Sequence, residues 1–133
     1  MITVLVFGTF DIVHPGHMNF LKQAKKHADK LVVVVARDLT VKALKGRFPE
    51  NNEERRLKNI KKLPYVDEAM LGSLGNDKYE IIEKIKPDVI ALGYDQYFFT
   101  EDLKKELKKR GILADIVRLK PYKEEIYKSS KLK

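Results

Sequence analysis

The sequence predicts an α/β domain, a single Rossmann-like, doubly wound unit over residues 1–133 with a five-stranded parallel sheet. Strand-like and helix-like segments alternate along the chain, which is the order that a parallel sheet with crossover helices requires. The run from Leu31 to Ala36 is apolar throughout and mostly valine, as is typical of a strand covered on both faces. A length of 133 residues is sufficient for one core without disulfides, and the chain contains no cysteine.

The first strand is expected over Ile2 to Phe7, an apolar run that ends at a glycine. Between lysines, apolar residues then recur at helical spacing, at Met18, Leu21, Ala24 and Ala28. The second strand is the run from Leu31 to Ala36, and Arg37 and Asp38 follow directly at its carboxyl end. We therefore expect these two charged residues at the edge of the sheet.

The middle of the chain predicts two helices and a strand. Residues 38–47 read as a short helix that breaks at Gly46, followed by a polar loop through Pro49 to Asn52, and loops with this many basic groups can be lids. A second helix is expected from about Asn52 to Lys62, because acidic residues occupy its first turn and a proline follows it. The third strand is expected over Val66 to Leu71.

The last part of the chain repeats the alternation. Asn76 is expected to cap a helix that ends before a proline, and the fourth strand covers Val89 to Leu92. Thr100 opens a helix with acidic residues at its start, basic residues at its end and Gly111 directly after. Ala114 to Leu119 is the fifth strand, and the polar, basic residues that follow predict no further helix.

The segment GTFDIVHPGH, between the first strand and the first helix, has the composition of a phosphate site. A turn at this position presents backbone N–H groups at a helix N-terminus, where the helix dipole favours an anion. His14 and His17 are three residues apart, so both rings can converge on a group that gains negative charge. Gly8 is expected to leave room for a ligand, while Pro15 and Gly16 suit the start of a helix.

Ligands of open parallel sheets bind outside the carboxyl ends of the strands, where the strand order reverses. This rule brings GTFD and HPGH together with Arg37 and Asp38 after the second strand and with GYDQ, residues 93–96, after the fourth. A dinucleotide fingerprint and a GxxxxGK phosphate loop are both absent from the sequence. Dehydrogenases of the Rossmann type and Walker-type ATPases are therefore disfavoured.

Two histidines at this spacing can also form half of a zinc site or only cap a helix. The chain has no cysteine, and its third histidine, His27, lies ten positions farther along the predicted helix. We therefore expect no metal site built from protein ligands alone.

The formal net charge of +8, from 27 Lys and Arg against 19 Asp and Glu, suits polyanionic ligands, which include both nucleotides and nucleic acids. A nucleic-acid-binding module is thus an alternative, but a disfavoured one, because aromatic residues do not alternate with a single basic stripe. No apolar run is long enough to cross a bilayer, and the opening run lacks a basic leader. Together with the absence of cysteine, this predicts a cytoplasmic protein without a membrane partner.

One part of the sequence resembles a known family signature, namely the residues Gly8, Thr9, Phe10, Asp11, His14, Gly16 and His17. They match GxFDxxHxGH of the nucleotidylyltransferase superfamily, and the resemblance continues through EERR at 53–56, YVDEA at 65–69, LGYDQ at 92–96 and SSKL at 129–132. The segments VVARD, VKALKGR and KPDVIALGYDQ look most like the archaeal FMN adenylyltransferases, also called FAD synthetases. The nearest competing resemblance is to glycerol-3-phosphate cytidylyltransferase.

This resemblance implies roles for individual residues. Catalysis would fall to His14, His17 and Arg55, the last of which would neutralise the leaving pyrophosphate. Lys42 and Lys45 would hold phosphates, and Asp11 would contact the acceptor. The implied nucleotide-binding residues are Thr9, Phe10, His14, His17, Asp95, Ser129 and Ser130. The chain departs from the family's IST[ST] motif before the serine pair, where Tyr127 and Lys128 stand in place of Ile and Ser.

The implied reaction is attack by the phosphate of FMN, or of another phosphomonoester, on the α-phosphorus of ATP or CTP. A phosphomonoester has a second pKa of about 6, so the nucleophile needs no general base near neutral pH. The reaction instead needs cations, N–H donors and a Mg²⁺ or other divalent ion carried by the nucleotide. From the residues alone, the lysine pair also fits a solvated helix face, Arg55 a surface network and the serines a polar tail. A homodimer with a contact through residues 64–70 is left open.

Overall fold

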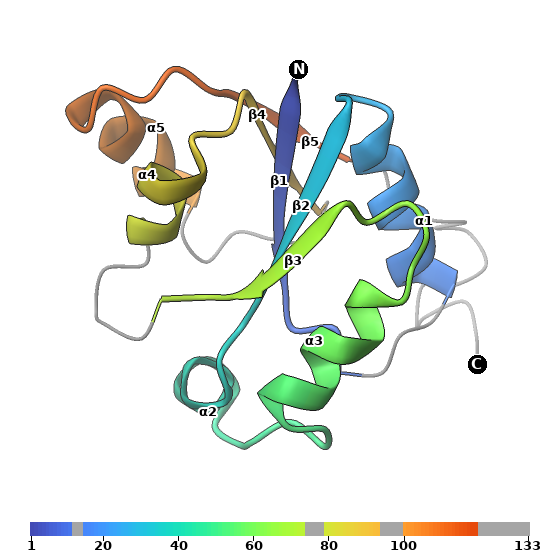
Figure 1. Ribbon diagram of the computed structural model, residues 1–133. Helices are drawn as coiled ribbons and strands as arrows, with labels where there is room; N and C mark the ends of the chain where they lie inside the picture. The colour runs from blue at the N-terminus through green and yellow to red at the C-terminus, as the bar shows by residue number, and fades with distance from the viewer. Residues whose placement is uncertain (12–14, 74–78, 94–99, 120–133) are drawn as a thin grey trace, which may run out of the picture.

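The computed structural model describes residues 1–11, 15–73, 79–93 and 100–119 (Figure 1). In chain order the elements are β1 (Thr3–Gly8), α1 (Pro15–Lys25), β2 (Lys30–Val35), α2 (Asp38–Lys45), α3 (Glu53–Lys61), β3 (Glu68–Leu71), α4 (Glu80–Ile85), β4 (Val89–Leu92), α5 (Thr100–Lys109) and β5 (Asp115–Arg118). The strands form one five-stranded sheet in the order β3-β2-β1-β4-β5, and every pairing is parallel. The predicted fold class is confirmed.

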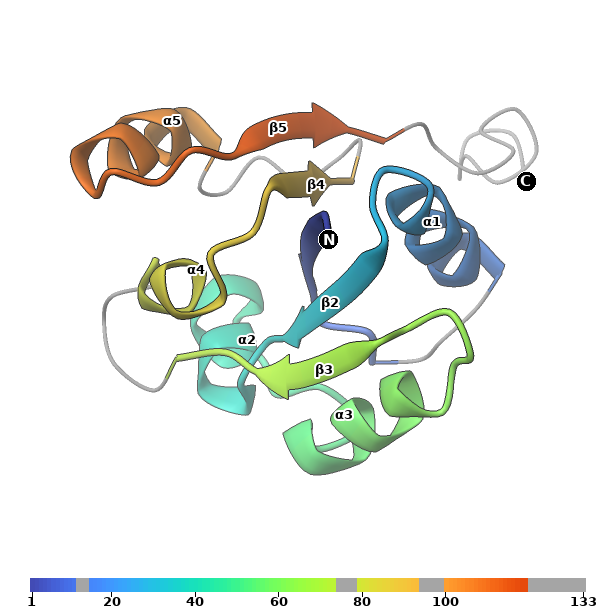
Figure 2. The same cartoon turned by 45° about the horizontal axis from the view of Figure 1, so that its top comes forward.

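Helices cover both faces of the sheet, with α1 and α3 on one side and α4 and α5 on the other (Figures 1 and 2). Alternate residues of β1 show how the core divides. Val4 and Val6 pack with Leu21 and Ile60 from α1 and α3, whereas Leu5 belongs to the cluster on the α4 and α5 side. All three β1 side chains are fully buried, which explains why the central strands have no polar alternation.

Helix ends follow the capping signals in the sequence. The side chain of Asn52 accepts a hydrogen bond from the backbone N–H of Arg55 at 2.8 Å and so caps α3, as expected. Gly46 ends α2 in the left-handed conformation, with a φ of 78°. The expected cap Asn76 lies outside the described residues, and α4 is described from Glu80.

The third strand is shorter than the expected Val66 to Leu71, because β3 begins only at Glu68. The backbone N–H of Val66 donates to Leu63 in the turn after α3. Asp67 uses a carboxylate oxygen to accept the backbone N–H of Leu31 at 2.7 Å, at the start of β2. A polar contact at the strand's amino end, which hydrophobicity does not reveal, therefore sets its start.

Two other aspartates accept backbone N–H groups at the amino-terminal end of the sheet in the same way. They directly precede β2 and β4, and the N–H groups that they accept belong to the start of β1. Asp29 accepts the backbone N–H of Ile2 at 2.8 Å, and Asp88 accepts that of Thr3 at 2.9 Å. These bonds satisfy the first donors of β1.

The strand order reverses at β1, because the chain passes from β1 to β2 and β3 on one side and then to β4 on the other. The carboxyl end of β1 is therefore the expected ligand site of the fold. α2 lies beyond the carboxyl end of β2, next to that edge (Figures 1 and 2). Among the described helices, none is long and apolar enough to cross a membrane.

Candidate active site

The turn after β1 is built around Phe10. Its backbone has a φ of 51°, which is unusual for a residue with a side chain, and its ring is only 3% exposed. The ring contacts His17 edge to face, with the two ring centroids 5.4 Å apart and the planes at 74°. This contact fixes the first turn of α1 against the end of β1. Since the Phe10 side chain is buried, its predicted nucleotide contact would have to come from the backbone.

Gly8 does not leave room for a ligand, so that expectation is wrong. A Cβ atom at this position would lie 2.5 Å from two atoms of the Phe10 ring. The glycine is thus required by a close approach within the protein itself. The ring fills the space directly beside Gly8.

Arg56 is the central polar group of this edge. It is fully buried, and its guanidinium makes four hydrogen bonds of 2.7–3.0 Å. The acceptors are the backbone carbonyls of Asn51, Thr9 and Ala36 and the carboxylate of Asp38. A buried guanidinium is tolerated only with such a complete set of partners. Arg56 thereby ties the ends of β1 and β2 to α2 and α3.

Sequence reasoning selected Arg55 and missed Arg56. Arg55 is exposed on α3, whereas Arg56 lies four residues before the buried Ile60, on the face of the helix that packs against the sheet. That i, i+4 spacing was the available signal. The catalytic role assigned to Arg55 stays a prediction.

Arg37 and Glu53 form a second ion pair, in addition to that of Arg56 with Asp38. Arg37 contacts Glu53 with an N–O distance of 2.9 Å and donates to the carbonyl of Gly72 at 2.8 Å. The other Glu53 oxygen accepts the backbone N–H of Asp38 at 2.8 Å. The carboxyl ends of β2 and β3 and the start of α3 are therefore held in one network.

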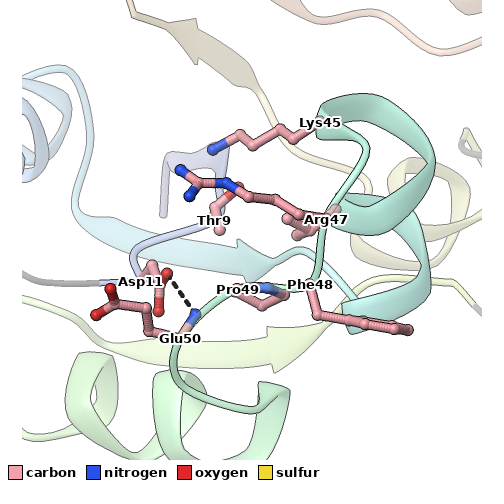
Figure 3. A pocket seen from close by; sticks show the side chains of 8 residues that line it. Thr9, Asp11, Lys45, Arg47, Phe48, Pro49 and Glu50 are labelled. Carbon is pink, nitrogen blue, oxygen red and sulfur yellow. Dashed lines mark hydrogen bonds between the residues drawn. The ribbon is translucent and has the colours of Figure 1, made fainter.

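Asp11 is joined to the segment that precedes α3 (Figure 3). Its two carboxylate oxygens accept the backbone N–H groups of Glu50 and Asn51, each at 2.8 Å, and the Asn51 side chain donates to the Asp11 carbonyl at 2.7 Å. Partial burial raises the pKa of Asp11. The hydrogen bonds from Asn51 and Glu50 and the charge of Arg56 outweigh that effect, so the pKa lies below its ordinary value of 3.8.

A pocket of about 160 Å³ opens next to Asp11 (Figure 3). Its lining residues combine cations with apolar groups and are Thr9, Asp11, Val41, Lys45, Arg47, Phe48, Pro49 and Glu50. The charged ends of Lys45 and Arg47 extend toward Thr9, while the Phe48 ring points the other way (Figure 3). The pocket thus presents two cations at the carboxyl end of β1.

The predicted phosphate-binding lysines have different surroundings. Lys45 lines the pocket, whereas Lys42 donates to the carbonyl of Gly46 at 2.9 Å and stands 5.6 Å from the centre of the Phe48 ring. We therefore distinguish a pocket lysine from one that closes the end of α2. Arg47, which sequence analysis did not select, joins Lys45 because the left-handed Gly46 turns the chain back toward the strand end.

Several predicted site residues lie outside the described part of the chain, namely His14, Asp95, Ser129 and Ser130. The convergence of two imidazoles therefore stays a prediction, and His17 supplies the one described ring. Among the described residues, no group of three or more His, Asp or Glu side chains could hold a metal ion.

The chain has relatives of known name that cover most of its length. The chain is 49% identical over 132 residues to the FAD synthase of Thermococcus kodakarensis, covering 99% of this chain and 86% of the relative. It is 56% identical over 119 residues to the FAD synthase of Methanothermus fervidus, covering 87% and 81% of the two chains.

Among solved structures, the chain resembles a protein from Thermoplasma volcanium described as a lipopolysaccharide core biosynthesis protein. The TM-score is 0.86 at 46% identity, over 92% of this chain and 98% of the other. A pantoate-beta-alanine ligase from Francisella tularensis, at a TM-score of 0.65 and 17% identity over 97% of this chain and 63% of the other, shares the fold alone. The profile of the cytidylyltransferase-like family matches residues 5–133, and with these relatives it shows that the chain belongs to that family of nucleotidyltransferases.

Proposed function

We propose that this protein is an FMN adenylyltransferase, which transfers AMP from ATP to the phosphate of FMN and releases FAD and pyrophosphate. The observation that carries the proposal is the pocket at the carboxyl end of β1, where Lys45 and Arg47 face the strand at which the sheet order reverses. Relatives of about half-identical sequence that carry the name FAD synthase support the choice of substrates.

The reaction requires charge neutralisation more than covalent chemistry. An oxygen of the FMN phosphate forms a bond to the α-phosphorus of ATP, and the bond from that phosphorus to the oxygen bridging to the β-phosphorus breaks. The electron pair leaves with pyrophosphate. FMN phosphate is mostly a dianion near neutral pH, so no base has to remove a proton.

The chain's own residues supply fixed positive charge for this step. His17 stands in the first turn of α1, where N–H groups and the helix dipole favour phosphate. Lys45 and Arg47 extend toward Thr9, which directly follows β1 (Figure 3). We assign the triphosphate of ATP to the two histidines. The cationic pocket of Lys45 and Arg47 would hold a phosphate group of one of the two substrates. Arg55 would then act on the leaving pyrophosphate.

A divalent cation would enter as part of the nucleotide substrate. We propose Mg²⁺, which prefers phosphate oxygens and water with one or two carboxylates.

Incubating the purified protein with each of two substrate pairs tests the proposal. ATP with FMN should give FAD and pyrophosphate in equal amounts, detected by chromatography and by a coupled phosphate assay. CTP with glycerol 3-phosphate is the competing pair, because the family profile is described as cytidylyltransferase-like. Turnover of that pair without FAD formation would replace the proposed function by the cytidylyltransferase alternative.

A further inference from the structure

We propose that Asp11 is a positioning residue that fixes the pocket wall carrying Arg47, and that it does not bind the phosphate of the acceptor. This inference rests on the proposed function and changes the role that the family resemblance implies for Asp11. It concerns the segment from Gly46 to Asn51, which we call the 46–51 wall. Four residues of the wall, at 47–50, line the pocket.

Both oxygens of the Asp11 carboxylate already accept hydrogen bonds from the backbone. One Asp11 oxygen accepts the N–H of Glu50 and the other accepts the N–H of Asn51, both at 2.8 Å. An ionised carboxylate can only accept hydrogen bonds. The phosphate group of FMN, above its second pKa, can likewise only accept them. A direct contact between the two would therefore bring like charges together without a proton to share.

Asp11 also belongs to a connected set of hydrogen bonds that includes Asn51 and Arg56. Asn51 returns a hydrogen bond to the Asp11 carbonyl at 2.7 Å, and the Asn51 carbonyl accepts from the buried Arg56 at 3.0 Å. Arg56 in turn donates to the Thr9 carbonyl, two residues before Asp11. The wall's carboxyl end is thus fixed to the end of β1 through Asp11 and Arg56.

The 46–51 wall carries exposed side chains between its two ends. α2 ends at Gly46, and α3 is capped by Asn52 directly after the wall. Arg47 and Phe48 between them are exposed. If the Asp11 bonds are lost, the wall is held mainly by its two ends, and Arg47 gains freedom relative to Thr9. Displacement of a phosphate-binding cation lowers transition-state stabilisation more than it alters folding.

Limited trypsin digestion without substrates measures this freedom directly, because Lys45 and Arg47 are cleavage sites in or beside the wall. In Asp11→Asn, the rate of cleavage after these residues, relative to cleavage after Lys61 in α3, should rise about tenfold over wild type. Glu54→Gln, which neutralises an exposed carboxylate of α3, is the matched control and should leave the ratio unchanged. An unchanged ratio in Asp11→Asn would overturn the proposal.

Steady-state kinetics provide the second readout. If Asp11 positions the wall, Asp11→Asn should lower kcat about tenfold or more, with a smaller change in the KM for FMN. If Asp11 instead binds the acceptor, the KM for FMN should rise while kcat and the cleavage ratio stay at wild-type values. That result would refute the positioning role.

Asn51→Ala keeps the test decisive if Asp11→Asn does not fold. This variant leaves the charge of Asp11 and both backbone bonds in place but removes the reciprocal bond from the Asn51 side chain. Its cleavage ratio should rise about threefold, and a wild-type ratio would count against the proposal. Because digestion needs no substrate, a failure of FAD formation by the wild-type protein overturns the proposed function without deciding the positioning role of Asp11.

Discussion

Replacing Arg56 with methionine should destabilise the protein severely, although methionine fits an apolar environment. The side chain is fully buried and donates to three backbone carbonyls and one carboxylate. Methionine leaves the carbonyls of Thr9, Ala36 and Asn51 without that donor, and because these residues are only half-buried, the loss of each hydrogen bond costs roughly 1 kcal/mol.

Asp38 adds a smaller amount, because its side chain is 28% exposed and water can replace part of the lost contact. Removal of the charged group's own desolvation cost offsets part of the loss. We therefore expect a decrease of about 3 kcal/mol in the free energy of unfolding, a large fraction of the 5–15 kcal/mol that is typical of domains.

Urea unfolding at 25 °C measures this change, and the dependence on urea concentration should stay constant so that midpoints can be compared. Arg55→Met is the matched control, because the neighbouring side chain is exposed on the same helix. It should alter the free energy of unfolding by less than about 0.5 kcal/mol. It should also lower kcat if Arg55 acts on pyrophosphate. A loss below about 1 kcal/mol in Arg56→Met would refute the account of the buried network.

Three further outcomes follow from the site. Gly8→Ala should lower the free energy of unfolding by about 1–3 kcal/mol and slow adenylyl transfer, because the added Cβ would lie 2.5 Å from the Phe10 ring. A variant with wild-type stability in urea would show that the ring moves freely. Lys45→Ala should lower kcat/KM for FMN by about tenfold or more, whereas Lys42→Ala should not, because Lys45 lines the pocket and Lys42 does not. Equal losses of kcat/KM in the two variants would remove the distinction between these lysines. The pKa of Asp11 is lowered on folding, so its charge stabilises the protein above the ordinary pKa of 3.8, and this contribution is lost as the pH falls through the folded-state pKa. Urea unfolding from about pH 6 to pH 3 should therefore show the stability gap between wild type and Asp11→Asn narrowing at the acid end, and a constant gap would contradict the assignment.

Much of the fold could be predicted because apolar runs and helix-capping residues, which are local features of the sequence, determine where most strands and helices lie. The strand Val89–Leu92 and the start of α5 at Thr100 lie where apolar runs and capping patterns place them. β3 could not be bounded in this way, because Asp67 binds a backbone N–H of β2, which is distant in sequence. A contact between residues 36 positions apart leaves no periodic signal.

The candidate site was predicted in its location but only partly in its side chains. The switch-point rule placed it at the carboxyl end of β1, where the pocket lies. Motif spacing could not distinguish Arg55 from Arg56, because both are arginines and only one helix face is buried. Nor could it show that the Phe10 ring occupies the space beside Gly8, since that depends on a φ of 51°.

The charged groups at this edge divide into two classes, and the division is suited to phosphate chemistry. Arg56, Arg37 and Asp11 are engaged with protein partners that hold the strand ends and the 46–51 wall in place. Lys45 and Arg47 extend toward Thr9 in the pocket. A reaction that needs no general base is accelerated by cations that are already in position, because no reorganisation is then required as charge develops. We therefore expect the internal ion pairs to contribute to catalysis indirectly, by fixing the backbone from which the pocket cations extend.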